Sequence, residues 1–248
     1  MKKIFSKLLV LVLIISLFVP LQYVKADIVK LNKTSISIQI GSNYTLKITG
    51  NNKATWESSD KTIATVSPKG LVTGKKIGKT KITATANKKK YSCSVTVTPI
   101  KYTEGQYKIG ADMPNGEYVI FSDNSESGYF SLTSDANGDN IIANENFDYN
   151  SIITVNKGEY LELSRSYAVN INDISKLDTS KSGMYKIGTF LPAGEYKLIA
   201  NSGEEGYYCI YSDNRQENIV TNDNFKNSSY VTVENGQYLL LSRCTIDK

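Results

Sequence analysis

Apolar and polar residues alternate with a period of two along most of the chain from residue 28 onward, which is the pattern of half-buried β-strands. The alternation is clearest at residues 36–40, 82–86 and 95–97. Glycine, proline and asparagine separate these runs, for example around Gly50 and Pro68, and such residues favour turns. No later stretch shows a helical period, so the sequence predicts an all-β protein.

The C-terminal part contains this pattern twice. Residues 105–165 align with residues 183–243 at a constant offset of 78 and without a gap, and 28 of the 61 positions are identical. The segments GxYKIG, PxGEY and the closing leucine-rich run before Ser-Arg occur in both copies. Residues kept in both copies serve the fold or a shared function. We therefore expect two homologous small repeats, sandwich-like or barrel-like, at residues 105–166 and 183–246.

Each copy is small. A repeat of about 60 residues is near the lower limit for burying a core alone. This favours docking of the two copies into one pseudo-symmetric unit.

The segments TWESSD, IATVS and GLVTG follow one another between residues 55 and 74. With the strand pattern around them, they make residues 28–98 similar to the bacterial immunoglobulin-like (Ig-like) group 2 domain. The resemblance implies an Ig-like β-sandwich at residues 27–99, used in surface proteins and adhesins as a stalk or display module. It supplies no catalytic residues.

The first 26 residues have the pattern of a secretory signal peptide. Three lysines precede an apolar run at residues 8–19, and Val-Lys-Ala at residues 24–26 suits a cleavage site. The run is shorter than the roughly 20 residues of a spanning helix. We expect a secreted or extracellular protein without a membrane span in its mature form, either released or held at the surface, for example at the cell wall, only by what it binds. A retained amphipathic anchor is the alternative.

Charge divides the chain into two parts. Removal of residues 1–26 lowers the net charge from +5 to +1, with +10 on residues 27–99 and −9 on the rest. Opposite signs imply different partners, or two parts that attract each other. The scattered lysines suit an anionic wall polymer. Nucleic acid fits poorly, because the basic part has few aromatic residues for stacking. The lysine, asparagine and isoleucine bias favours a Gram-positive source.

Tyrosine is concentrated in the C-terminal part, because 14 of the 17 tyrosines lie beyond residue 100. Strand alternation turns Tyr129, Tyr160, Tyr207 and Tyr238 away from the predicted leucine core. One interpretation is an outer face that contacts sugars or proteins. The other is that these rings close a second layer or the seam between the copies.

Two cysteines distinguish the second copy. Cys209 and Cys244 occupy positions that are Ser131 and Ser166 in the first copy. Their joint appearance in an exported chain predicts a disulfide, provided that their strands are neighbours.

Candidate catalytic chemistry is sparse. The sequence has no histidine, which excludes Ser-His-Asp and Cys-His systems and histidine metal sites. Residues 135–139 resemble the start of a calcium loop, but the second copy has Arg215 where a ligand would be, which favours a plain loop. Glu117 and Glu195 occur in both copies, as do Arg165 and Arg243. A structural ion pair with an arginine explains the two acids more simply than a carboxylate pair for glycoside cleavage. No catalytic, cofactor-binding or metal-binding residue is predicted.

These observations favour a non-enzymatic binding or adhesion protein of the bacterial surface. The Ig-like domain would act as a stalk or wall contact, and the repeats would contact a cell-wall polymer, a glycan or a surface protein. The alternatives are a structural envelope component without a specific ligand and a carbohydrate-active hydrolase.

Overall fold

The computed structural model describes residues 29–50, 53–123 and 127–247 of the chain. In these ranges every regular element is a β-strand except one 3₁₀ turn, η1 (Ile171–Asp173), which confirms the predicted all-β fold class. None of the described elements is a helix that is long and apolar enough to cross a membrane. The predicted signal peptide, residues 1–26, lies outside the described residues.

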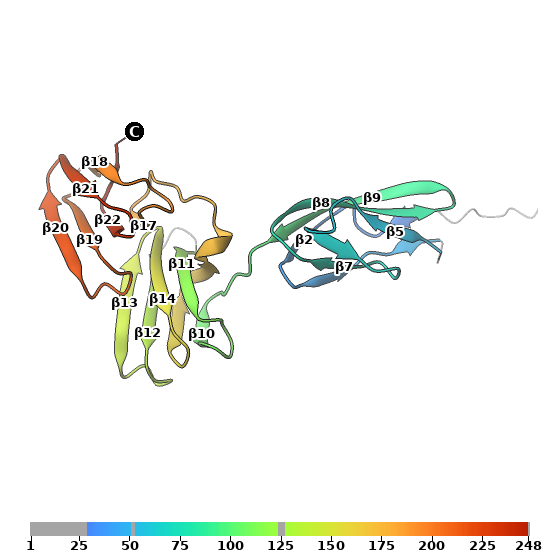
Figure 1. Cartoon of the computed structure of the whole chain (residues 1–248), viewed down its shortest axis with the longest axis horizontal. Helices are drawn as coiled ribbons and strands as arrows, with labels where there is room; N and C mark the ends of the chain where they lie inside the picture. The colour runs from blue at the N-terminus through green and yellow to red at the C-terminus, as the bar shows by residue number, and fades with distance from the viewer. Residues whose placement is uncertain (1–28, 51–52, 124–126, 248) are drawn as a thin grey trace, which may run out of the picture.

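The N-terminal domain is a sandwich joined to the repeats by one extended segment (Figure 1). A four-stranded sheet in the order β2-β9-β8-β5 and a three-stranded sheet in the order β3-β7-β6 enclose its core, and β1 pairs with β4. Only the β2–β9 pair among these is parallel. The strands are β1 (Lys30–Leu31), β2 (Ser35–Gln39), β3 (Asn43–Thr45), β4 (Ile48–Thr49), β5 (Thr55–Ser58), β6 (Ala64–Val66), β7 (Leu71–Gly74), β8 (Gly78–Ala86) and β9 (Lys89–Thr98).

Period-two alternation builds this core. Ile82 and Cys93 lie on the inner side of their strands and are fully buried. Trp56 packs against the same core and covers the turn at Gly70. A Cβ atom at Gly70 would lie 2.9 Å from the indole ring, and its backbone φ is +80°, so glycine is required there.

Repeat 1 is a second sandwich. Its four-stranded sheet has the order β10-β15-β12-β13 and its three-stranded sheet the order β14-β11-β16. Tyr118, Phe130, Leu161 and Leu163 fill the space between them, as the alternation predicted for the leucines. The strands are β10 (Gly105–Lys108), β11 (Gly116–Ser122), β12 (Gly128–Thr133), β13 (Ile141–Phe147), β14 (Asn150–Val155), β15 (Tyr160–Ser164) and β16 (Ser166–Asn170).

Repeat 2 has the same topology, with sheets β17-β22-β19-β20 and β21-β18-β23. Its predicted core residues Leu239 and Leu241 are buried. The strands are β17 (Gly183–Lys186), β18 (Gly194–Ala200), β19 (Gly206–Tyr211), β20 (Ile219–Phe225), β21 (Ser228–Val233), β22 (Tyr238–Ser242) and β23 (Cys244–Ile246).

The shared PxGEY segment is a turn closed by its own tyrosine. The hydroxyl of Tyr118 donates to the carbonyl of Pro114 at 2.9 Å, and that of Tyr196 donates to Pro192 at 2.8 Å. These tyrosines are therefore kept in both copies for a structural reason.

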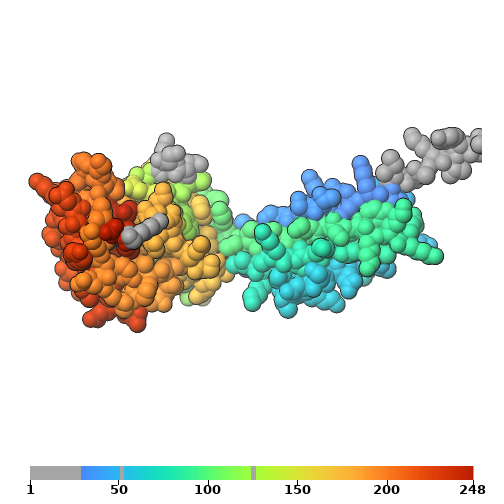
Figure 2. Space-filling model, turned by 90° about the horizontal axis from the view of Figure 1, so that it is seen from above, coloured from blue at the N-terminus to red at the C-terminus, as the bar shows by residue number. Residues whose placement is uncertain are grey.

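The two repeats dock through unlike faces and form one lobe (Figure 2). Val119 and Ile152 point away from the core of repeat 1 and are completely buried against repeat 2, in the hydrophobic cluster that also contains its core. They cover the outer face of the four-stranded sheet of repeat 2, which carries Met184, Cys209 and Leu240. We call this contact the seam.

Sequence differences between the copies follow the seam. Lys197 and Tyr230 occupy in repeat 2 the positions of Val119 and Ile152, and Tyr230 is 62% exposed. Glu162 occupies in repeat 1 the position of the seam leucine of β22, and it is exposed. Each sheet face is therefore apolar in the repeat where it is covered and polar in the repeat where it is free. The capping units of repeat arrays have polar outer faces of this kind.

Replacing Ile152 with alanine should lower the free energy of unfolding of the repeats by about 2–4 kcal/mol, because it leaves a cavity in the seam. The matched change Tyr230→Ala should cost less than about 0.5 kcal/mol, because that ring is exposed. Urea unfolding followed by far-UV circular dichroism measures both losses. The fluorescence of Trp56, the only tryptophan, monitors the Ig-like domain separately. Equal losses in the two variants would contradict this view of the seam.

Candidate functional site

A polar network crosses the seam. The carboxylate of Glu117 on β11 accepts from Nζ of Lys186 at 2.6 Å and from the hydroxyl of Tyr238 at 2.7 Å. Nδ2 of Asn214 donates to the same carboxylate at 2.9 Å and to Oγ1 of Thr154 at 2.9 Å. All three donors to Glu117 belong to repeat 2, so this one side chain of repeat 1 fixes the register of the two repeats.

The loop between β19 and β20 of repeat 2 supplies further contacts to repeat 1. Nη2 of Arg215 donates to both carboxylate oxygens of Glu159, at 2.7 and 2.8 Å. Nε2 of Gln216 donates to Oε2 of Glu145 at 2.7 Å. The equivalent residues of repeat 1, 136–138, are Ala-Asn-Gly and lack this set of long side chains. The loop therefore holds repeat 2 on repeat 1, a role for which the equivalent loop of repeat 1 lacks the side chains.

The calcium-like segment at residues 135–139 is a self-capped loop. The carboxylate of Asp135 accepts from the backbone N–H groups of Asn137, Asp139 and Asn140, and these bonds hold its pKa below the usual value. Asp213 accepts the equivalent bonds in repeat 2. Within residues 29–50, 53–123 and 127–247, no three His, Cys, Asp or Glu side chains are grouped so that they could hold a metal ion.

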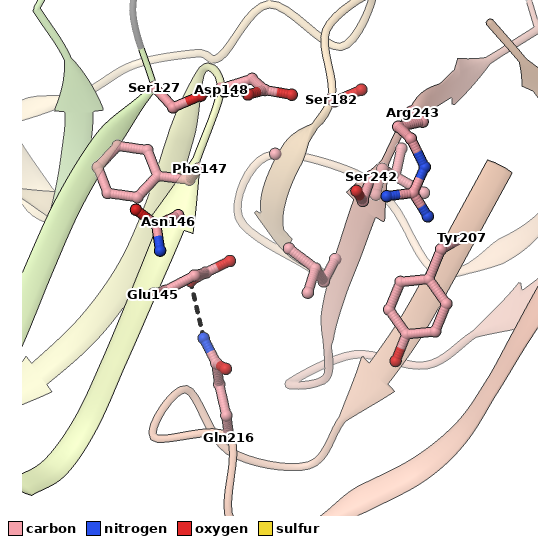
Figure 3. Close-up of a pocket in the computed structure, with 13 residues that line it drawn as sticks. Ser127, Glu145, Asn146, Phe147, Asp148, Ser182, Tyr207, Gln216, Ser242 and Arg243 are labelled. Atoms are coloured by element: carbon pink, nitrogen blue, oxygen red, sulfur yellow. Dashed lines mark hydrogen bonds between the residues drawn. The ribbon is translucent and has the colours of Figure 1, made fainter. Parts of the chain in front are cut away.

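A cleft of about 480 Å³ lies beside the seam, between the edge strand β13 of repeat 1 and strands β19 and β22 of repeat 2. Figure 3 shows Glu145 and Asn146 on one side of it and Tyr207 and Arg243 on the other. Gln216 reaches in from the loop described above. Both repeats contribute side chains, so the cleft exists only while they are docked.

Glu145 is the titratable group at the inner side of the cleft. It accepts hydrogen bonds from Oγ of Ser151 and Nε2 of Gln216. Burial raises the pKa of Glu145 to about 7, although both hydrogen bonds act in the opposite direction. Near neutral pH the carboxyl group is thus present in both forms and can donate to a ligand or accept from it.

Tyr207 and Arg243 supply donors from repeat 2. Burial raises the pKa of the Tyr207 hydroxyl, which keeps it protonated. Arg243 has a left-handed backbone with φ of 53°, and its Nε donates to the carbonyl of Glu205 at 2.9 Å. Arg165 repeats this arrangement in repeat 1, with φ of 49° and a bond to Ser127 at 3.0 Å. The two arginines kept in both copies therefore hold loops, and that of repeat 2 also lines the cleft.

The four tyrosines predicted as a ligand face do not share one surface. Tyr207 lines the cleft, whereas Tyr238 is buried in the seam with its hydroxyl on Glu117. Tyr129 and Tyr160 are half-buried on the outer face of the four-stranded sheet of repeat 1. The tyrosines differ because repeat 1 covers the outer face of the four-stranded sheet of repeat 2, which carries Tyr207 and Tyr238. Repeat 2 does not cover the equivalent face of repeat 1, which carries Tyr129 and Tyr160.

The disulfide predicted between Cys209 and Cys244 is not formed in the structure, where both are buried free thiols. Sγ of Cys244 donates to the carbonyl of Tyr207 at 3.2 Å, and Oγ of Ser166 donates to that of Tyr129 at 3.1 Å. The thiol thus takes the place of the serine hydroxyl in the same hydrogen bond. Burial raises the pKa of Cys244 to about 11, so it remains a protonated donor.

Sequence reasoning found some of these residues and missed others. It predicted a structural ion pair of Glu117 with an arginine, and the structure shows the ion pair with Lys186 as the partner. Glu195, the equivalent acid, is exposed on repeat 2. Asn214 and Gln216 were missed. The signal that could have found them is the joint replacement of Ala-Asn-Gly by Asn-Arg-Gln in an otherwise similar loop.

The fold and the docked repeats define an extended, all-β protein with an Ig-like domain ahead of a two-sandwich unit. Residues 26–97 match the family model of the bacterial Ig-like domain (group 2). The N-terminal domain is a member of that family, as the sequence predicted. No curated protein matches the chain.

Two solved structures are similar to parts of the chain. One is an intimin mutant of EHEC O157:H7, with 21% identity, a TM-score of 0.27 and coverage of 32% of this chain and 52% of the other. The other is SGBP-B from the mixed-linkage glucan utilization locus of Bacteroides ovatus, in complex with a mixed-linkage heptasaccharide. It has 12% identity, a TM-score of 0.16 and coverage of 56% of this chain and 50% of the other. The matches thus span about half the length of each solved structure.

The titration of Glu145 predicts that the repeats lose stability as pH rises. The folded state binds this proton more tightly than the unfolded chain, where the pKa is about 4.5, so the stabilisation is complete below pH 4.5 and is lost through pH 7. Between pH 5 and 8 the free energy of unfolding should fall by roughly 2 kcal/mol more in the native protein than in Glu145→Gln.

Urea titrations at several pH values measure this difference. Asp223→Asn, at the equivalent exposed position of repeat 2, is the control and should keep the native pH profile. An unchanged profile in Glu145→Gln would disprove the assignment.

The free thiols predict that denatured, unreduced protein takes up three iodoacetamide groups per chain, which mass spectrometry counts directly. Cys244→Ser should cost less than about 1 kcal/mol, because repeat 1 uses serine for the same bond. Uptake of one group, with a loss of about 2–5 kcal/mol, would instead establish the disulfide.

Proposed function

We propose that this chain is an extracellular binding protein whose docked repeats hold a carbohydrate in the cleft between them. The Ig-like domain acts as the spacer that carries this unit away from its point of attachment. The extracellular placement is supported by the leader-like N-terminal pattern and by the Ig-like group 2 domain.

The composition of the cleft is the observation that carries the proposal. The carboxyl group of Glu145 and the amides of Asn146 and Gln216 offer planar donors and acceptors, and Arg243 adds cationic donors. Tyr207 adds one rigid ring with a hydroxyl. Ligand sites for apolar molecules are lined mainly by hydrophobic side chains. The lining also includes the ring of Phe147 and the side chains of Leu240 and Leu241. This combination of polar and apolar groups suits a sugar, which presents hydroxyl groups at its edge and C–H groups on its face.

Binding explains the cleft better than catalysis does. The carboxyl of Glu145 is held by two protein donors, and Glu117 is saturated by three. Asp148 also lines the cleft, so a pair of carboxyl groups is present and a glycoside hydrolase is the second candidate. Turnover of a bound oligosaccharide that disappears in Glu145→Gln would favour the hydrolase over the binding protein.

Tyr207→Ala should weaken carbohydrate binding at least 10-fold, because it removes the only aromatic ring that faces the cleft from repeat 2 among the described residues. The measurement is binding of the labelled protein to an array of immobilised bacterial and host oligosaccharides, followed by titration of the best hit. Asn146→Ala should weaken binding as well.

Each variant has a matched control in the other copy. Tyr129→Ala and Asn224→Ala change the equivalent residues, which do not line the cleft, and should bind as the native protein does. Equal binding by Tyr207→Ala and Tyr129→Ala, with both folded, would remove the cleft as the site.

A further inference from the structure

The β8–β9 hairpin of the Ig-like domain concentrates positive charge. Residues 78–98 contain five lysines and no acidic residue. Lys79, Lys81 and Lys90 lie on the outer side of the four-stranded sheet, because the alternate residues of both strands face the core, and all three are exposed. The other two lysines, residues 88–89, extend the row at the hairpin tip. Figure 1 shows this tip at the end of the domain farthest from the repeats.

Hydroxyl groups surround these ammonium groups. Lys79 pairs across the strands with Thr96 and Lys81 pairs with Ser94, and the side chains between them and Lys90 on this face are serine or threonine. Apart from Glu57 on β5, this part of the face therefore consists of ammonium and hydroxyl groups, without a large apolar or aromatic side chain. Lys79 and Lys81 are about 7 Å apart along the strand, and Lys90 lies roughly 14 Å farther on.

Few acids oppose this charge. The acids in the described part of the domain are Glu57 and Asp60. Asp60 accepts from the N–H and the hydroxyl of Thr62 at 2.8 and 2.6 Å, so its carboxylate is engaged locally. Glu57 lies on β5 opposite Thr83 and therefore on the same face of the sheet, where it offsets one of the positive charges. The three lysines consequently carry a local excess of positive charge.

We propose that this lysine face binds a polyphosphodiester, that is, an extended chain with a phosphate in every repeat unit, and so gives the Ig-like domain a ligand of its own. Lysine ammonium groups are compact point charges suited to phosphate, and neighbouring hydroxyls donate to its free oxygens. A row of cations several ångströms apart matches repeated charge better than a single anion. The absence of stacking residues on the face disfavours recognition of nucleobases.

The test is a titration of the full chain with poly(glycerol phosphate) by calorimetry between roughly 0.05 and 0.3 M salt, a range over which the screening of exposed charges increases. The variant Lys79→Gln, Lys81→Gln, Lys90→Gln should bind at least 10-fold more weakly at 0.1 M salt. The slope of log K against log salt should become shallower by about 2, since about 0.7 is lost for each charge removed.

The control is Lys33→Gln, Lys61→Gln, Lys69→Gln, which removes the same charge from exposed positions outside the hairpin. It should lose less than about 2-fold. Equal losses in both triple variants, equal binding of a carboxylate polymer such as hyaluronate, or no binding at all would each overturn the proposal. So would a salt-dependent docking of the acidic repeats on this face, seen by small-angle scattering. Tyr207→Ala should leave this binding intact, which separates it from the cleft.

Discussion

The C-terminal half depends on one contact between the two repeats. The outer face of the three-stranded sheet of repeat 1 packs on the outer face of the four-stranded sheet of repeat 2. A sandwich of about 60 residues buries little surface by itself. Val119 and Ile152 of repeat 1 extend the hydrophobic cluster of repeat 2, while repeat 1 also has a separate core of its own. Glu117 then fixes their register through three donors of the other repeat. The cleft follows from this register, because its two sides belong to different repeats.

A head-to-tail contact raises a problem that a two-fold contact does not. An interface between unlike faces can continue from molecule to molecule and form a filament. Here the faces at the two ends of the pair have been changed: Lys197 and Tyr230 stand where repeat 1 has Val119 and Ile152, and Glu162 replaces a leucine. Docking of a further copy would remove water from the charged groups at these positions, which costs free energy and opposes a filament. At these positions, the two copies therefore differ according to whether the surface is covered by the other repeat.

The alternation of residues was sufficient to predict the β-strands and the leucine core, because strand periodicity reports burial within one sheet. The Ig-like sandwich was predicted from the family resemblance of the motifs between residues 55 and 74. It could not predict the seam, since the outer face of a strand looks alike whether water or another sheet covers it. Tyr207 and Tyr238 show this: they share a sheet face, yet one lines a cleft and the other is buried. The paired change to Cys209 and Cys244 suggested a bond, but Cys244 replaces a serine in an existing hydrogen bond and Cys209 lies in the seam.

The seam also contains groups that make folding less favourable than an apolar contact would. Glu145 is a carboxyl whose pKa is raised by burial, so its ionised form opposes folding above neutral pH. Asn150 donates to the carbonyl of Met184 at 2.7 Å, but its Oδ1 is buried without a protein partner among the described residues. Such groups are expensive in a structural interface and common at functional sites. Because Glu145 also lines the cleft, the same residue connects the stability of the docked repeats with the chemistry available to a ligand.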